Sequence, residues 1–121
     1  MKDKIAQIIY ENQYGCTHEE AIEHLGFTIE QYPEWDKYSN KKEYIQYAQD
    51  ILNNPKFKTS KEKMAKRLFE LMEPNSKYIW SFNNPDDRVI ITGNVLYEYC
   101  LSQWQQDDYL NIAYHIMKII N

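Results

Sequence analysis

The sequence contains few of the residues that usually mark catalysis, disulfide cross-linking or membrane insertion. Its 121 residues include only two cysteines, Cys16 and Cys100, too few for a disulfide framework or a four-cysteine zinc site. Its three glycines are well separated, which excludes a glycine-rich loop that cradles phosphate. No apolar run approaches the roughly 18 residues of a membrane-spanning helix, and the first residues lack the apolar core of a signal peptide. We therefore expect a cytoplasmic, non-enzymatic protein that uses no cofactor and contacts no membrane.

The residues that are present are typical of one folded domain. Hydrophobic residues make up 43% of the chain and charged residues 26%, so we expect a single domain spanning residues 1–121. Lysine outnumbers arginine by 12 to 2, and Lys, Ile, Asn and Tyr together fill 47 of the 121 positions. Because these four residues have AT-rich codons, the composition favours a low-GC bacterium or its phage as the source.

The net charge of −4 conceals three blocks of different sign. Residues 1–36 hold two basic and eight acidic groups, whereas residues 37–77 hold ten basic and five acidic groups. Residues 78–121 hold two basic and five acidic groups. Charge asymmetry of this kind affects which partners a protein attracts more than it affects the fold.

Apolar residues recur at helical spacing along most of the chain, which predicts a mainly α, compact helical bundle. Thr17 with Glu20, and Thr59 with Glu62, have the spacing of capping boxes that begin helices. The last predicted helix has the widest apolar arc, so we expect it to be central and buried. The predicted helices cover residues 2–13, 18–25, 41–53, a segment from the Thr59 cap to about Met72, 94–104 and 107–120.

Two β-rich runs, residues 78–82 and 88–92, flank a turn-rich linker and predict a β-hairpin. Tyr78, Trp80 and Phe82 would share one face of the first strand, because alternate residues of a strand point the same way. Tyrosine and tryptophan often anchor protein interfaces. This aromatic face would be covered either by the C-terminal helices or by a partner protein.

The stretch THEEAIEHLGFT, residues 17–28, concentrates histidine and glutamate and invites a test for zinc. Two histidines bind one ion from a single helix when they are four residues apart, since that spacing places both rings on one face. His18 and His24 are six residues apart and lie on different faces. We therefore expect no metal site here.

Residues 3–36 also resemble a helix-turn-helix motif. Gly26 falls at the turn, and Thr28 is placed to cap a third helix. Leu25 and Phe27 would pack inward, which predicts an N-terminal tri-helical segment. A DNA-reading helix needs basic or amide groups, whereas this segment presents carboxylates, so we expect its acidic face to bind protein. The candidate protein-binding carboxylates are those of Glu19, Glu20, Glu23, Glu30, Glu34 and Asp36.

The basic charge gathers in the stretch KFKTSKEKMAKR, residues 56–67, which is the best candidate for contact with nucleic acid. Its lysine-rich composition favours a diffuse phosphate-binding surface over bidentate reading of bases, for which arginine is better suited. The alternative is an ordinary solvated face opposite the apolar side of a helix. The basic residues are Lys56, Lys58, Lys61, Lys63, Lys66 and Arg67.

Two functional hypotheses follow from this sequence. The first is a small inhibitor, or an immunity or anti-defence protein, whose acidic face covers a basic surface on another protein, such as one that binds nucleic acid. The second is a nucleic-acid-binding regulator that contacts phosphates through residues 56–67. In either case we expect a monomer or a homodimer.

Overall fold

Helices form most of the protein, as the sequence predicts. The computed structural model describes residues 1–76, 78–80, 88–91, 96–101 and 103–120. The helices are α1 (Lys2–Asn12), α2 (His18–His24), α3 (Lys41–Leu52), α4 (Lys61–Met72) and α5 (Gln103–Ile120), with the 3₁₀ helices η1 (Trp35–Lys37) and η2 (Pro55–Lys58). The strands are β1 (Tyr78–Ile79), β2 (Arg88–Ile91) and β3 (Leu96–Cys100).

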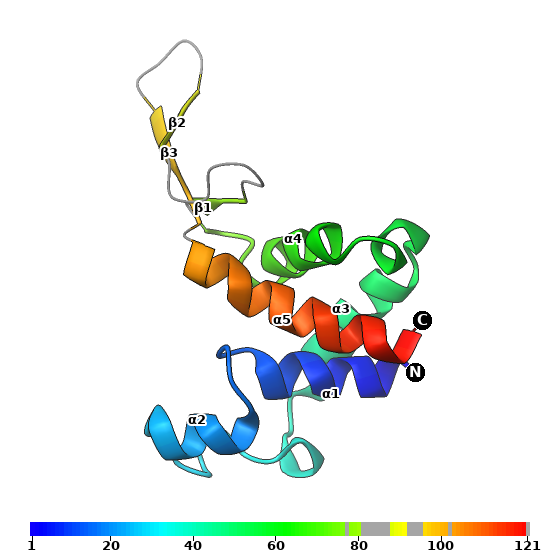
Figure 1. Cartoon of the computed structure of the whole chain (residues 1–121). Coiled ribbons are helices and arrows are strands. Elements are labelled where there is room, and N and C mark those ends of the chain that lie inside the picture. The colour runs from blue at the N-terminus through cyan, green and yellow to red at the C-terminus, as the bar shows by residue number, and fades with distance from the viewer. Residues whose placement is uncertain (77, 81–87, 92–95, 102, 121) are drawn as a thin grey trace.

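The four longer helices pack around one apolar core. In Figure 1, α1 and α5 run side by side with α3 behind them and α4 above, and the two ends of the chain lie close together. The last helix, α5, packs against both α1 and α4, which confirms its central position. The largest fully buried side chains come from all four helices: Ile5, Ile9, Ile51, Met64, Leu68, Ile112 and Ile116.

Side-chain caps begin two of the helices. The Thr17 hydroxyl accepts a hydrogen bond from the Glu20 amide at 3.1 Å, so the predicted cap of α2 is confirmed. Helix α4 is capped by Ser60 and not, as we predicted, by Thr59. The Ser60 hydroxyl accepts from the Lys63 amide at 3.2 Å, whereas the Thr59 hydroxyl donates back to the Lys56 carbonyl. Adjacent hydroxyl residues compete for one cap position, and sequence spacing alone did not choose between them.

The third helix that the helix-turn-helix resemblance predicts after Thr28 is reduced to a single turn. The amides of Gln31 and Tyr32 donate to the Thr28 carbonyl, and the chain then leaves the helical path before Pro33. Proline disfavours helical geometry in the residue before it, which explains the early end. Only the short η1 follows, so no recognition helix forms. The expected inward packing is also wrong for Leu25, which is 53% exposed.

The strands occupy two of the expected places but pair differently from the predicted hairpin. Strand β3 lies between the others, parallel to β1 and antiparallel to β2. Among the described residues, β2 therefore pairs with β3 and not with β1, so the expected pairing between the two β-rich runs is wrong there. Residues 96–100 are a strand although we predicted helix there; LYEYC alternates and is rich in tyrosine, which favours strands. The predicted linker at residues 83–87 lies outside the described residues.

A group of aromatic rings attaches residues 28–38 to the helical body. The Tyr10 ring on α1 packs against the rings of Tyr32, Trp35, Tyr38 and Tyr44 at centroid distances of 4.5–5.4 Å. The Tyr10 hydroxyl donates to the Pro33 carbonyl, and the Tyr32 hydroxyl donates to the Tyr10 carbonyl. These reciprocal bonds fix the loop between α2 and η1 against α1, although it has almost no regular structure of its own.

Candidate functional site

An acidic hollow lies where α1, α2 and η1 meet. Its volume is about 490 Å³. Residues close in space but distant in sequence contribute carboxylates to it, because the aromatic group brings the loop before η1 back onto α1. We call it the acidic hollow; it is lined by Gln7, Glu11, Asn12, Thr17, His18, Glu19, Glu34, Trp35 and Asp36.

His18 fixes the geometry of the acidic hollow. Its Nε2 lies 2.9 Å from the Tyr32 carbonyl oxygen and 3.1 Å from that of Pro33. Carbonyl oxygens only accept hydrogen bonds, so Nε2 carries the hydrogen and donates to both. This contact joins the first turn of α2 to the loop that leads into Glu34. The histidine that we tested for zinc therefore has a structural role.

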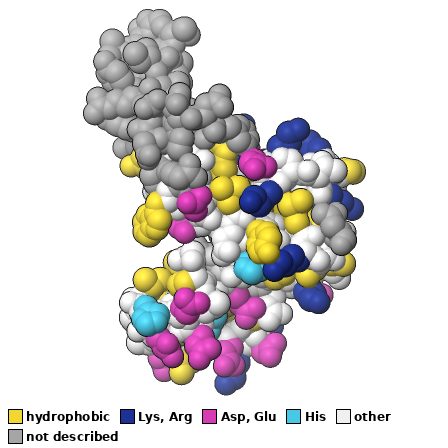
Figure 2. Space-filling model, in the orientation of Figure 1, with side chains coloured by type: hydrophobic (Ala, Val, Ile, Leu, Met, Phe, Trp, Pro, Cys, Tyr) yellow, Lys and Arg dark blue, Asp and Glu magenta, His cyan; other side chains and the backbone are white. Residues whose placement is uncertain are grey.

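The carboxylates around the acidic hollow are not neutralised by basic side chains. Glu11, Glu19, Glu34 and Asp36 form no ion pair with any residue that the structure describes. Lys41 reaches this region without pairing with a carboxylate: its Nζ donates to the main-chain carbonyl of Asp36 at 3.3 Å and lies 5.4 Å from the centre of the Trp35 ring. Figure 2 shows the acidic side chains gathered over the α2 end of the molecule, away from most of the basic ones.

The structure divides the predicted acidic face into two groups. Glu19, Glu34 and Asp36 border the acidic hollow. Glu20, Glu23 and Glu30 are exposed but lie outside its lining; Glu20 accepts from the Thr17 hydroxyl, and Glu23 lies 3.9 Å from His24. Sequence reasoning missed the contributions of Glu11 and Trp35. Neither residue belongs to residues 17–28, the stretch that drew attention in the sequence. Their place at the hollow depends on the long-range contacts of Tyr10.

The predicted aromatic face does not form among the described residues. Tyr78 is 45% exposed, whereas Trp80 is 8% exposed and packs against the rings of Phe69 and Tyr109. Trp80 follows the end of β1, so the strand alternation that we used to place it with Tyr78 does not extend to it. Phe82 lies outside the described residues.

A second hollow, of about 430 Å³, lies between η2 and α4 and gathers part of the basic segment. Lys63, Lys66, Arg67 and Glu70 line it from α4, where their spacing places them on one face. From η2, Lys56 also lines it, next to the buried Phe57. We call it the basic hollow; its lining is Asn54, Lys56, Phe57, Lys63, Lys66, Arg67 and Glu70, so Lys58 and Lys61 lie outside it.

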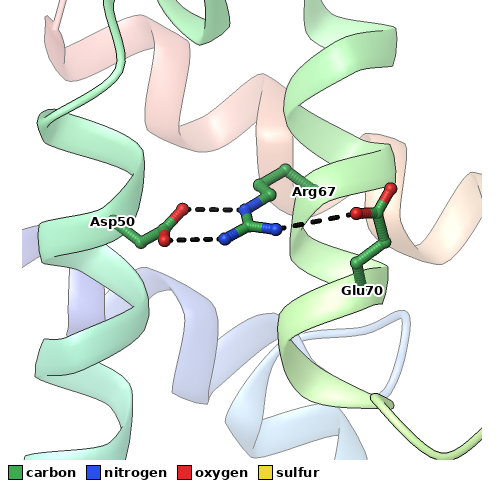
Figure 3. Close-up of polar contacts among 3 residues, drawn as sticks. All are labelled: Asp50, Arg67 and Glu70. Carbon is green, nitrogen blue, oxygen red and sulfur yellow. Dashed lines mark hydrogen bonds and ion pairs between the residues drawn. The ribbon is translucent and has the colours of Figure 1, made fainter.

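Arg67 is held in place by carboxylates on both sides (Figure 3). Its Nε and Nη2 atoms each donate to Asp50 of α3 at 2.8 Å, and its Nη1 lies 3.6 Å from Glu70. The hydrogen bonds from Arg67 lower the pKa of the Asp50 carboxyl group, and those to Asp50 raise the pKa of Arg67. Arg67 thus joins α3 to α4, and its charge is largely balanced locally.

The described residues contain no group of three or more His, Cys, Asp or Glu side chains arranged to hold a metal ion. Among the same residues, no helix has both the length and the apolar character needed to cross a membrane. Comparisons with protein-family models, with curated proteins and with solved structures gave no match.

Proposed function

We propose that this chain is a non-enzymatic protein-binding protein whose acidic hollow receives a basic surface of another protein. The observation that supports this proposal is the convergence of Glu11, Glu19, Glu34 and Asp36 from three separate elements on one hollow. None of these carboxylates has an ion-pair partner in the described part of the chain. Like charges gathered in this way attract a cationic partner and repel acidic ones.

The acidic hollow is also preorganised for binding. Tyr10, Tyr32 and His18 hold its loop through hydrogen bonds to main-chain carbonyls, so little backbone freedom remains to be lost when a partner binds. A protein that covers a basic surface blocks whatever that surface binds. An inhibitor, or an immunity or anti-defence protein, directed at a nucleic-acid-binding target would act in this way, and the composition favours a low-GC bacterium or phage as its source.

The proposal is tested with a fluorescently labelled arginine-rich peptide and the same peptide with citrulline in place of arginine. Citrulline keeps the shape of the side chain and removes its charge. We expect the full chain to bind the arginine peptide with an affinity that falls as the salt concentration rises. It should not bind the citrulline peptide. Binding of both peptides alike would contradict a charge-based mechanism.

A matched pair of variants separates the acidic hollow from net charge. The hollow variant is Glu19→Lys with Glu34→Lys; the control is Glu43→Lys with Glu62→Lys, exposed positions in the first turns of α3 and α4. Both change the charge by the same amount. We expect the hollow variant to weaken binding by about 30-fold, roughly 2 kcal/mol, and the control by no more than about threefold. Equal losses would show that only net charge matters.

A nucleic-acid-binding regulator remains the second candidate, favoured by the convergence of Lys56, Lys63 and Lys66 on the basic hollow. Its test is the fluorescence anisotropy of mixed-sequence duplex and single-stranded DNA at low and at physiological salt. Binding that weakens steeply with salt and is lost in Lys63→Glu with Lys66→Glu would support it. Arg67 is left unchanged in this variant because it joins α3 to α4.

A further inference from the structure

The basic hollow differs from the diffuse basic surface expected from the sequence. Of the six basic residues in residues 56–67, four border one concavity, while Lys58 and Lys61 lie outside its lining. The cationic groups reach it from two elements, Lys56 from η2 and the others from α4. A nucleic-acid strand is bound by an extended track of charges, whereas a bounded hollow fits one compact anion.

The charges of the basic hollow favour an anion with more than one negative charge. Among the described residues that line it, Glu70 is the only carboxylate, against Lys56, Lys63, Lys66 and Arg67. Neither Lys56 nor Lys63 lies within ion-pair distance of a carboxylate in the described ranges, and Lys56 lies 5.3 Å from the centre of the Phe57 ring. Arg67 is already paired with Asp50, so Lys56 and Lys63 are the groups best placed to neutralise a ligand.

The two elements that line the basic hollow, η2 and α4, are held in place by buried side chains. Phe57 is 5% exposed and anchors η2 to the core, while Met64 and Leu68, on the opposite side of α4, are fully buried. The paired hydrogen bonds between Arg67 and Asp50 fix α4 relative to α3. Lysine binds phosphate as a point charge, so lysines around a fixed concavity can hold phosphate groups.

We infer that the basic hollow binds a compact polyphosphate group, with Lys56 on one border and Lys63 and Lys66 on the other, and with Asn54 as a neutral polar group. Adjacent phosphates allow one ligand to meet cations from both borders. A free nucleotide and the triphosphorylated end of an RNA strand carry the same group. This site is separate from the acidic hollow, so its test does not depend on the proposed protein binding. It replaces the general nucleic-acid alternative with one ligand class, a polyphosphate group.

Inorganic tripolyphosphate is the probe, titrated into the full chain by calorimetry at low salt. The basic-hollow variant is Lys63→Gln with Lys66→Gln. The matched control is Lys58→Gln with Lys61→Gln, which removes the same charge from the same segment. We expect the basic-hollow variant to bind tripolyphosphate at least about tenfold more weakly than the wild type, because each lost hydrogen bond to a charged group lowers the binding free energy. The control should bind it within about threefold of the wild type. Circular dichroism checks that both variants are folded.

The remaining outcomes either overturn the site or identify the source of its ligand. No binding of tripolyphosphate, or equal weakening by both variants, would overturn the site. Equally tight binding of oligonucleotides with a 5′-triphosphate and with a 5′-hydroxyl would also overturn it, because phosphodiester contacts would then suffice. Tighter binding of the 5′-triphosphate oligonucleotide than of a free nucleoside triphosphate would support the site with an RNA end as its ligand. Equally tight binding of these two ligands would support the site with a free nucleotide as its ligand.

Discussion

Glu19, in the first turn of α2, and Glu34, immediately before η1, border the same hollow although the turn at residues 28–32 separates them in sequence. Neither forms an ion pair with a described residue, so the folded chain holds two like charges that a cation would neutralise. Their positions depend on the aromatic contacts beneath the loop. Binding and the stability of that loop should therefore be linked.

Removing the Tyr32 hydroxyl tests how far these contacts stabilise the loop. In Tyr32→Phe the ring packing remains, but the hydrogen bond to the Tyr10 carbonyl is lost. We expect the free energy of unfolding to fall by about 1 kcal/mol, because the Tyr10 carbonyl loses one of its two side-chain donors and keeps only Gln13 Nε2, at 3.0 Å. Urea denaturation measures this change. Tyr47→Phe removes an exposed hydroxyl that bonds Glu43 and serves as the control, with an expected loss of less than about 0.5 kcal/mol.

Alkaline pH should also destabilise this part of the protein. Burial raises the pKa of Tyr10 and of Tyr44 to about 12, from the ordinary value of 10.0. Between pH 10 and 12 the unfolded chain therefore binds fewer protons than the folded one, and stability falls as pH rises. We expect the free energy of unfolding to be insensitive to these tyrosines below pH 10 and to fall by about 1 kcal/mol or more by pH 12. The same fall in Tyr44→Phe as in the wild type would contradict a contribution from Tyr44.

Two glycines offer a matched test of backbone and packing. Gly15 and Gly26 both have positive φ angles, 76° and 77°. A Cβ atom at Gly15 would lie 2.3 Å from Oδ1 of Asp108 on α5, whereas one at Gly26 would meet nothing within 4 Å. We expect Gly26→Ala to cost about 1 kcal/mol of unfolding free energy, and Gly15→Ala about 1 kcal/mol more because Asp108 must move.

The excess cost at Gly15 should depend on Asp108. Repeating Gly15→Ala in an Asp108→Ala background should reduce its cost to that of Gly26→Ala, as measured by thermal or urea unfolding. An unchanged excess would show that the contact with α5 is not its cause.

The ion pair between Asp50 and Arg67 should make a pH-dependent contribution to stability. The hydrogen bonds from Arg67 lower the Asp50 pKa below its ordinary value of 3.8. The contribution is therefore complete above about pH 4 and is lost as pH falls further. Because both side chains are about one-third exposed, we expect Asp50→Asn to lower the unfolding free energy at neutral pH by only about 1 kcal/mol.

Acid titration supplies the check on that ion pair. The difference in unfolding free energy between wild type and Asp50→Asn should shrink below about pH 4, whereas Glu70→Gln, which removes a weaker 3.6 Å contact, should differ little from wild type at any pH. A difference that persists unchanged in acid would point to a packing effect of the substitution.

The sequence predicted the helices better than the strands or the hollows. Apolar spacing located α1, α3 and α4 to within a few residues, because each buries one face against a shared core. It failed at residues 96–100, where a short tyrosine-rich run is compatible with both the helical and the strand periodicity. Only pairing with β1 and β2 makes this run a strand. Ser60 and Thr59 likewise differ only in which hydroxyl reaches the Lys63 amide.

The candidate sites were predicted only in part, for a related reason. Charge blocks identified the acidic and basic segments, but not which members converge. Glu34 joins Glu19 because Tyr10 and His18 hold the intervening loop, and Lys63 joins Lys56 because Phe57 anchors η2. Long-range contacts of this kind have no local signature in the sequence.

The most direct test of the acidic hollow is to map the arginine-rich peptide on the isotope-labelled full chain by NMR. Shifts that change on titration should concentrate on Glu11, Glu19, Glu34 and Asp36, together with the indole N–H of Trp35. The citrulline peptide should leave these signals in place. Changes that spread over all acidic residues, or that centre on the surface around Glu43 and Glu62, would contradict the proposed site.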